Sequence, residues 1–275
     1  MGASVTDEVS ALSQRIACGI EYDGSGYHGW QLQANQSGST VQAEVERALA
    51  EIAIAPVRVQ CAGRTDTGVH ASEQIIHFDP PVNRELKAWV QGANRHLPGN
   101  VRILWASAVT GDFHARFSAQ ARRYRYIIAN TGVCPAVLRG QVTWHRRPLD
   151  EQLMHEEAQV LLGEHDFGSF RAARCQSSTG IRNIHFINVS RRGQLVIIDI
   201  KANAFLHHMV RNIAGCLLSV GSGRAEAGWL EHVLSLRDRR QAADTAAPHG
   251  LYLVSVEYPA QYSLPQMPLG PLLLG

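Results

Sequence analysis

The chain has 275 residues, 45% of them hydrophobic, which is enough for one large domain or two ordinary ones with a core. Its formal net charge is only +2, and no apolar run approaches the roughly 20 residues that cross a bilayer, so we expect a soluble protein without a membrane partner. The five cysteines are scattered and lack a C-x-x-C pair, which argues against a thiolate zinc site and favours a reducing, cytoplasmic location.

The first part of the chain predicts the element order β-α-β-β-α-β. Residues 40–53 have the apolar spacing of an amphipathic helix, and Thr40 is its expected N-cap. A second helix, residues 84–97, ends before Pro98-Gly99. Alternating or short apolar runs predict strands at residues 15–22, 57–61, 73–79 and 101–109. This order is the split arrangement of ferredoxin-like domains.

The second part repeats that order. Residues 122–129 alternate as a strand, and a helix over 150–162 begins near Asp150. A hairpin turns at Arg192-Gly193 between strands 181–190 and 194–200. Helices follow at 205–220 and 226–236, and the last strand is 251–257.

We therefore predict an α/β fold (α+β by stricter naming) of two ferredoxin-like halves. The halves share an extended antiparallel sheet with helices on one side. The expected division is a disordered N-terminus at 1–14, an N-terminal half at 15–111, a C-terminal half at 112–260 and an extended tail at 261–275. The tail is rich in Pro and Leu, so it cannot be a regular helix and we expect it to lie over the body.

The small net charge conceals two basic stretches. There is no acid between Asp112 and Asp150 but there are seven arginines, and none between Asp166 and Asp199 but there are five. Guanidinium forks suit bidentate contact with phosphate and stacking on bases. Charge therefore favours a nucleic-acid partner, with a solvated basic face as the alternative.

One loop stands out as a candidate catalytic element, Gly63-Arg64-Thr65-Asp66-Thr67-Gly68-Val69-His70. It lies between two predicted strands, and its glycines allow a sharp turn and a close approach to a ligand. The neighbours of Asp66 are expected to keep this carboxylate ionised and aimed, as a nucleophile requires. An ordinary turn stabilised by aspartate-to-backbone hydrogen bonds is the alternative.

The sequence GRTDTGVHA around Asp66 is similar to the GRTDxGVHA signature of the tRNA pseudouridine synthase A family. Five further stretches also resemble that family, and they occur in order over nearly the whole chain: EYDGSGYHGWQ, DFHARFSAQARRYRYII, HDFGSFRA, DIKANAFLHHMVRNIAG and GLYLVSVEYP. Thr67, where the family commonly has Ala, and Gly168 are small departures.

The resemblance implies the chemistry. Pseudouridine formation breaks the C1′–N1 bond of uridine, turns the uracil and joins C1′ to C5, so no cofactor is needed. Asp66 resembles the catalytic aspartate, which attacks C6 or C1′ or gives a glycal; the sequence leaves these routes open. Arg64 resembles the residue that helps evert the nucleotide, and Tyr124 the tyrosine that stacks on the target base. Arg211 resembles the basic residue that pairs with the aspartate.

The resemblance also implies the RNA contacts and the partner. Residues similar to tRNA-contacting positions of the family are Arg84, then Phe113, His114, Ala115, Arg116 and Phe117, then Arg174, Cys175, Gln176, Ser177 and Ser178. They imply a central RNA-binding cleft between the halves that holds the anticodon stem-loop of tRNA, with uridines 38, 39 and 40 as targets. A homodimer, with one tRNA spanning both subunits, is implied as well.

Other interpretations stay open. A pseudouridine synthase with a different RNA target, or an RNA-binding or RNA-folding module, fits the same residues. Gly24 to Gly29 reads as a literal G-x-G-x-x-G, but no helix is predicted at its third glycine, which argues against a dinucleotide site. His207 and His208 are expected to be helical neighbours pointing about 100° apart, so we predict no metal site.

Overall fold

The computed structural model describes residues 14–31, 39–173 and 175–275, so the predicted disordered start lies outside the described residues apart from Gln14. Ten strands form one sheet, whose main path runs β4-β1-β3-β10-β5-β9-β8-β7. Two short strands extend it, because β2 (Gln60–Cys61) pairs with β3 and β6 (Thr143–His145) pairs with β5. The main strands are β1 (Ile16–Tyr22), β3 (His70–Phe78), β4 (Val101–Ala108), β5 (Ala121–Asn130), β7 (Gly163–Asp166), β8 (Ile181–Arg192), β9 (Leu195–Ala202) and β10 (Leu251–Glu257).

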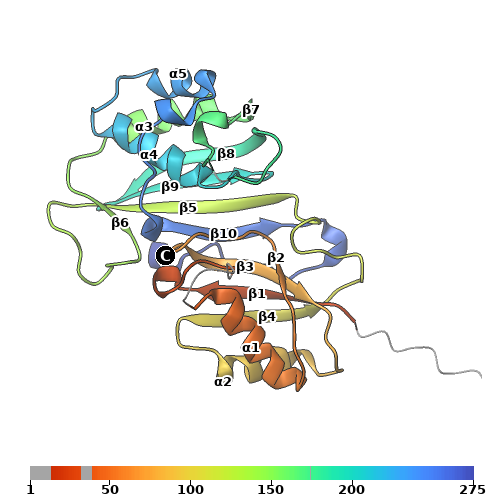
Figure 1. The fold of residues 1–275 in the computed structure, drawn as a ribbon. Coiled ribbons are helices and arrows are strands. Elements are labelled where there is room, and N and C mark those ends of the chain that lie inside the picture. Colours follow the sequence, from red (N-terminus) through yellow and green to blue (C-terminus); the bar gives the residue numbers. More distant parts are fainter. Residues whose placement is uncertain (1–13, 32–38, 174) are drawn as a thin grey trace, which may run out of the picture.

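The sheet contains the ferredoxin-like arrangement twice, which confirms the predicted fold class. The series β4-β1-β3-β2 and the series β10-β5-β9-β8 each place the first and third strands of a β-α-β-β-α-β unit side by side. Figure 1 shows how the last strand, β10, returns to the middle of the sheet between β3 and β5. The sheet is not wholly antiparallel: β10 pairs with β3 in parallel at Tyr252 and Leu253, and β5 pairs with β6 in parallel.

The five α-helices of the described residues all contribute to one continuous core on one face of the sheet, and none of them contributes to the two smaller apolar clusters. They are α1 (Val41–Ala53), α2 (Ala93–His96, preceded by a π-helical turn), α3 (Glu151–Ala158), α4 (Met209–Gly221) and α5 (Trp229–Leu236). The predicted N-caps are confirmed, since Thr40 Oγ1 accepts from Ala43 N at 3.3 Å and Asp150 Oδ1 accepts from Leu153 N at 2.9 Å. None of the described helices has the length and apolarity needed to cross a bilayer.

The opposite face of the sheet carries two smaller clusters, covered by irregular chain. Phe113 and Ala115 pack there in the first half, and the ring of Tyr262 lies edge-on to Phe113 at 5.0 Å between centroids. In the second half the C-terminal tail brings Leu274 into the cluster. Arg125 Nη1 also donates to the carbonyl of Gly270 at 2.7 Å, so the tail is fixed to β5.

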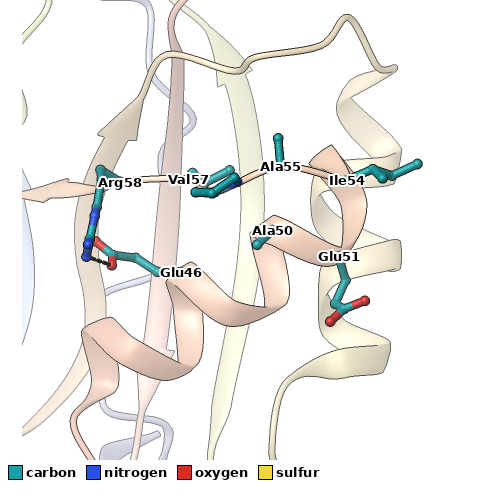
Figure 2. Close-up of a pocket in the computed structure, with 8 residues that line it drawn as sticks. Glu46, Ala50, Glu51, Ile54, Ala55, Val57 and Arg58 are labelled. Atoms are coloured by element: carbon teal, nitrogen blue, oxygen red, sulfur yellow. Dashed lines mark hydrogen bonds and ion pairs between the residues drawn. The ribbon is translucent and has the colours of Figure 1, made fainter.

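Two of the hollows on the surface of the described residues lie outside the site predicted from the sequence. One, of about 530 Å³, lies where α1 ends and is lined by Glu46, Ile54 and Arg58 among others (Figure 2). The other, of about 290 Å³, lies beside the tail, next to His70 and Tyr252. Asp66 lines neither of them.

Candidate active site

The loop that carries Asp66 is rigidly anchored between β2 and β3. The buried side chain of Gln74 bonds to both the amide and the carbonyl of Gly63, at the start of the loop. Thr65 turns inward, and its hydroxyl lies 2.7 Å from that of Tyr22. The Asp66 carbonyl accepts from Val69 N at 3.1 Å, which closes the turn. The Asp66 side chain keeps 24% of its surface exposed, so a ligand can reach it.

The segment that resembles a dinucleotide fingerprint serves instead as the support for this loop. A Cβ on Gly24 would lie 1.9 Å from the carbonyl oxygen of Val69, and one on Gly29 would lie 2.7 Å from that of Thr65. Gly29 also has φ +87°, a region that favours glycine. Trp30 N then donates to the same Thr65 oxygen at 3.0 Å. The glycines allow two backbones to touch, and the sequence reasoning missed this role.

Three side chains from the chain around the start of α4 surround the Asp66 carboxylate. Arg211 Nη1 lies 3.2 Å from Oδ2, as the resemblance implied. Arg211 is itself fixed, because its Nε donates to the Ala246 carbonyl at 2.8 Å. His207 Nε2 lies 3.3 Å from Oδ1, and His208 Nε2 lies 3.3 Å from Oδ2. A residue of the first half thus meets three residues of the second.

The prediction that His207 and His208 point apart is wrong. It assumed a helix from residue 205, whereas α4 begins at Met209 and the two histidines lie in the turn before it. His208 has φ +63°, in the left-handed region, and the two rings lie 4.0 Å apart between centroids with an interplanar angle of 39°. Burial lowers the pKa of His208. The adjacent histidines in the sequence were the available signal. That they converge is revealed only by the late start of α4, at Met209, which leaves both histidines outside the helix.

Tyr124 lies on β5 beneath the Asp66 loop. Only 9% of its surface is exposed, and its ring meets the edge of Phe205 at 5.1 Å between centroids. Its hydroxyl lies 3.6 Å from the position that a Cβ on Gly63 would take. Burial raises the pKa of the Tyr124 phenol, so this group is neutral at pH 7. Arg64, in the loop itself, is exposed.

Several arginines of the first basic stretch are used inside the protein, so only part of the stretch can contact phosphate. Arg122 donates to four backbone carbonyls, at 3.1 Å to Ala62 and Ala119, 3.0 Å to Asn203 and 2.6 Å to Arg116. Arg123 and Arg125 both bind the buried carboxylate of Asp199. The exposed members are Arg116, Arg139, Arg146 and Arg147.

The predicted RNA-contacting segment around Arg116 is only partly accessible. Phe113 and Ala115 are fully buried, so their side chains cannot touch a macromolecule in this conformation. Phe117 is 75% exposed, with the His114 ring 4.3 Å from its own and the Arg116 guanidinium 5.5 Å from its centroid. This stack presents an aromatic face to solvent.

The remaining predicted contacts are divided between two places. Arg84 lies against the end of α1, where its Nε donates to the Ile52 carbonyl at 3.3 Å. The second segment lies beside the site, because Cys175 Sγ accepts from His207 N at 3.5 Å and Arg171 Nη2 donates to the Ser177 carbonyl at 2.6 Å. Gln176 and Ser178 are exposed, and Arg174 lies outside the described residues.

Comparisons with known proteins indicate the family of the chain. A family described as tRNA pseudouridine synthase matches residues 19–118 and 158–259. The tRNA pseudouridine synthase A of Coxiella burnetii (strain Dugway 5J108-111) is 56% identical over 94% of this chain and 99% of its own length. That of Shewanella sp. (strain W3-18-1) is 55% identical over the same shares. Among solved structures, an archaeal box H/ACA sRNP Nop10-Cbf5 complex aligns with 79% of this chain and 47% of its own at 11% identity; its TM-score of 0.33 is too low to support any conclusion.

Proposed function

The chain belongs to the tRNA pseudouridine synthase family, and from this we propose that it converts uridines 38, 39 and 40 of the tRNA anticodon stem-loop to pseudouridine, with Asp66 as its nucleophile. The observation that carries the proposal is the contact of Asp66 with Arg211 at 3.2 Å, which joins the loop of one half to α4 of the other. The pair supplies one fixed carboxylate on an accessible surface, and this is what nucleophilic attack on uridine requires.

The reaction is an isomerisation that needs few groups. The C1′–N1 bond breaks, the uracil turns, C1′ joins C5, and the proton of C5 leaves while N1 gains one. Asp66 is the group that forms a bond to the nucleotide, at C6 or C1′, or it removes the 2′ proton. Arg211 holds one carboxylate oxygen and balances its charge, so the other oxygen, Oδ1, is the one available for attack.

Eversion of the target nucleotide is assigned to Arg64 and Tyr124. Taking a base out of its stack costs a few kcal/mol, which protein contacts have to offset. Arg64 is exposed near Asp66, and its guanidinium can bind a backbone phosphate of the everted nucleotide or occupy the space that the base leaves in the stack. Tyr124 offers a ring for stacking, worth about 1–3 kcal/mol. Because its phenol is neutral in the free protein, it is no preformed base for the C5 proton.

The tRNA-binding surface is proposed to extend to both sides of Asp66. It would include the accessible residues His114, Arg116 and Phe117 of one segment and Gln176 and Ser178 of the other. Arg84, at the end of α1, would reach only a more distant part of the RNA. Phosphate contacts by arginine make binding salt-dependent, so affinity should fall steeply between about 50 and 200 mM salt.

We also propose that the protein works as a cytoplasmic homodimer. Exposed apolar side chains support the dimer, since Val133 and Val137 in the loop after β5 and Leu272 in the tail are more than 80% exposed. All five cysteines are free, in keeping with a reducing compartment. Sedimentation at micromolar concentration tests the assembly, and a monomer would refute it.

The test of the nucleophile is Asp66→Ala, assayed on tRNA transcripts with a uridine at one of the three positions. The variant should bind tRNA but give no pseudouridine. Thr67→Ala is the matched control, since Thr67 is the exposed neighbour in the same loop and should leave the rate unchanged. Pseudouridine formed by Asp66→Ala would refute the role of Asp66.

The test of the target is a map of pseudouridine in cellular tRNA with and without the gene. Loss confined to positions 38, 39 and 40 is expected. Loss at other positions would assign a different RNA target, and an unchanged map would refute the proposed specificity.

A further inference from the structure

Asp66, His207 and His208 form a cluster with the geometry of a metal site. One ligand atom from each, a carboxylate oxygen and two imidazole nitrogens, lies within 4.8 Å of the others. Across residues 14–31, 39–173 and 175–275, no other group of three or more potential His, Cys, Asp or Glu ligands converges in this way. The cluster is open to solvent on the histidine side, where His207 keeps 41% of its side chain exposed.

The backbone holds the two imidazoles in place before any ion arrives. His207 is fixed on both sides, since its amide donates to Cys175 Sγ and its carbonyl accepts from Ala172 N at 3.1 Å. His208 adopts φ +63° and ψ +4°, a left-handed conformation that is strained for a residue with a side chain. Strain of this kind is concentrated at functional sites. Here it turns both rings to the same side, towards Asp66.

We propose that Asp66, His207 and His208 bind a borderline divalent transition metal such as Zn²⁺, and that the bound ion inhibits pseudouridine formation by occupying the catalytic carboxylate. The inhibitory part rests on the proposed role of Asp66, whereas the binding part does not. Zinc sites with three nitrogen or oxygen ligands and one water are a common open arrangement.

The distances fit such an ion. With metal–ligand bonds of about 2.0–2.1 Å, ligands on one edge of a tetrahedron lie about 3.3 Å apart. The edge from Asp66 Oδ1 to His207 Nε2 measures 3.3 Å. His208 Nε2 lies 3.3 Å from the other oxygen, Oδ2, and the ligand atoms of the three residues lie within 4.8 Å of one another. Oδ1 is the oxygen for the metal, because Oδ2 is held by Arg211. Imidazole ligands select Zn²⁺ over Mg²⁺, which prefers oxygen and keeps its waters.

The guanidinium of Arg211 sets the strength of the site. Its positive charge lies 3.2 Å from Oδ2 and repels an incoming cation, so binding is weaker than at a structural zinc site. The ion is therefore exchangeable. It acts as an inhibitor that a chelator removes, and the reaction itself needs no metal.

Binding is tested by titrating Zn²⁺ into the full chain without RNA in a calorimeter, after treatment with a chelator. One ion per chain is expected, and Mg²⁺ should give no heat. Loss of an outer-shell partner already weakens metal sites about 10–100-fold, so His207→Gln and His208→Gln should each lose at least as much. The double variant His96→Gln, His232→Gln, which changes exposed histidines elsewhere, is the control and should bind as the wild type.

Circular dichroism of each variant establishes that it is folded, and the absorption of bound Co²⁺ gives an independent signal for tetrahedral coordination. Equal Zn²⁺ affinity in the wild type and in both single histidine variants would overturn the proposal. So would the absence of binding to the wild type.

Inhibition is measured as the ratio of rates with and without Zn²⁺ for each variant. The wild type and the control variant should be inhibited and recover with a chelator, and His207→Gln and His208→Gln should show a ratio near one. Equal inhibition of all four proteins would show that Zn²⁺ inhibits from another place, and would refute inhibition through the site of Asp66, His207 and His208. Asp66→Asn separates the two proposals: if it still makes pseudouridine, the nucleophile assignment fails, while calorimetry decides the metal site by itself.

Discussion

Substitution of Gly29 by alanine tests whether the glycine segment positions the catalytic loop. The added Cβ would lie 2.7 Å from the carbonyl oxygen of Thr65 and 3.2 Å from the carbonyl carbon of Asp66. Ordinary contact begins at 3.4 Å, so the loop has to retreat by about 0.7 Å. The backbone is also strained, because Gly29 has φ +87°.

These two effects give separate magnitudes. A left-handed conformation costs a residue with a side chain roughly 1–2 kcal/mol, which in a protein of this size lowers the melting temperature by about 2–4 °C. A 1 Å misplacement of a catalytic group can slow a reaction about 100-fold, so a displacement of about 0.7 Å should slow pseudouridine formation by roughly 10- to 100-fold. The rate should fall by more than the stability loss explains at a temperature where the variant is folded.

The assay is single-turnover pseudouridine formation at 25 °C, beside a thermal melt. Gly26→Ala is the matched control in the same turn, because a Cβ there would meet only the side chain of Asn100, at 4.0 Å. It should keep nearly the full rate. If Gly29→Ala matches Gly26→Ala in rate, the glycine segment does not set the position of Asp66 and the reasoning is wrong.

Three further predictions concern stability, each measured by urea unfolding. Arg122→Lys should lower the free energy of unfolding by about 2–4 kcal/mol, because one ammonium cannot donate to all four carbonyls that Arg122 binds, that of Ala62 included. The control Arg116→Lys, at an exposed position, should lower it by almost nothing, and equal losses would refute the role of the Arg122 guanidinium. Burial lowers the pKa of His77 to about 4, below its unfolded value of about 6.5. The folded state therefore favours the neutral imidazole, and the stability that this gives is complete above pH 6.5 and is lost as the pH falls towards 4. The wild type should therefore lose about 2 kcal/mol more than His77→Gln between pH 7.5 and 5, and parallel curves would contradict this. Ile54 is 82% exposed and has φ +53° at the end of α1 (Figure 2). Ile54→Gly should therefore raise the free energy of unfolding by about 0.5–1 kcal/mol, and Ile54→Ala by less. A lower stability of the glycine variant would disprove backbone strain at this position.

Much of the fold was readable from local patterns, because those patterns are local in origin. Alternation of apolar residues predicted nearly all the long strands, and the two N-caps at Thr40 and Asp150 followed from residue type. The short strands β6 and β7 were missed, since three or four residues carry too little periodicity. The start of α4 was placed four residues early, because nothing local predicts that His208 adopts a left-handed conformation.

The candidate site shows the same division. Asp66, Arg64, Tyr124 and Arg211 could be named from motifs, because each belongs to a run of residues similar to one family. Gln74, Tyr22 and Gly29 could not, because each acts by touching the Asp66 loop, Gln74 and Gly29 at its backbone and Tyr22 at the Thr65 hydroxyl, and such contacts leave no motif. Which arginines of the basic stretch are accessible could not be predicted, since composition does not distinguish an arginine that faces solvent from one bound to Asp199.

The sequence by itself determined the order of the elements, the presence of one carboxylate in a glycine-bounded loop and the family that this loop indicates. Only the tertiary structure decided which groups surround that carboxylate. Asp66 and Arg211 are 145 residues apart, and their contact exists because β10 returns to pair with β3 and with β5. Pairing of distant strands depends on the packing of whole faces rather than on neighbouring residues, so it cannot be read from any one segment.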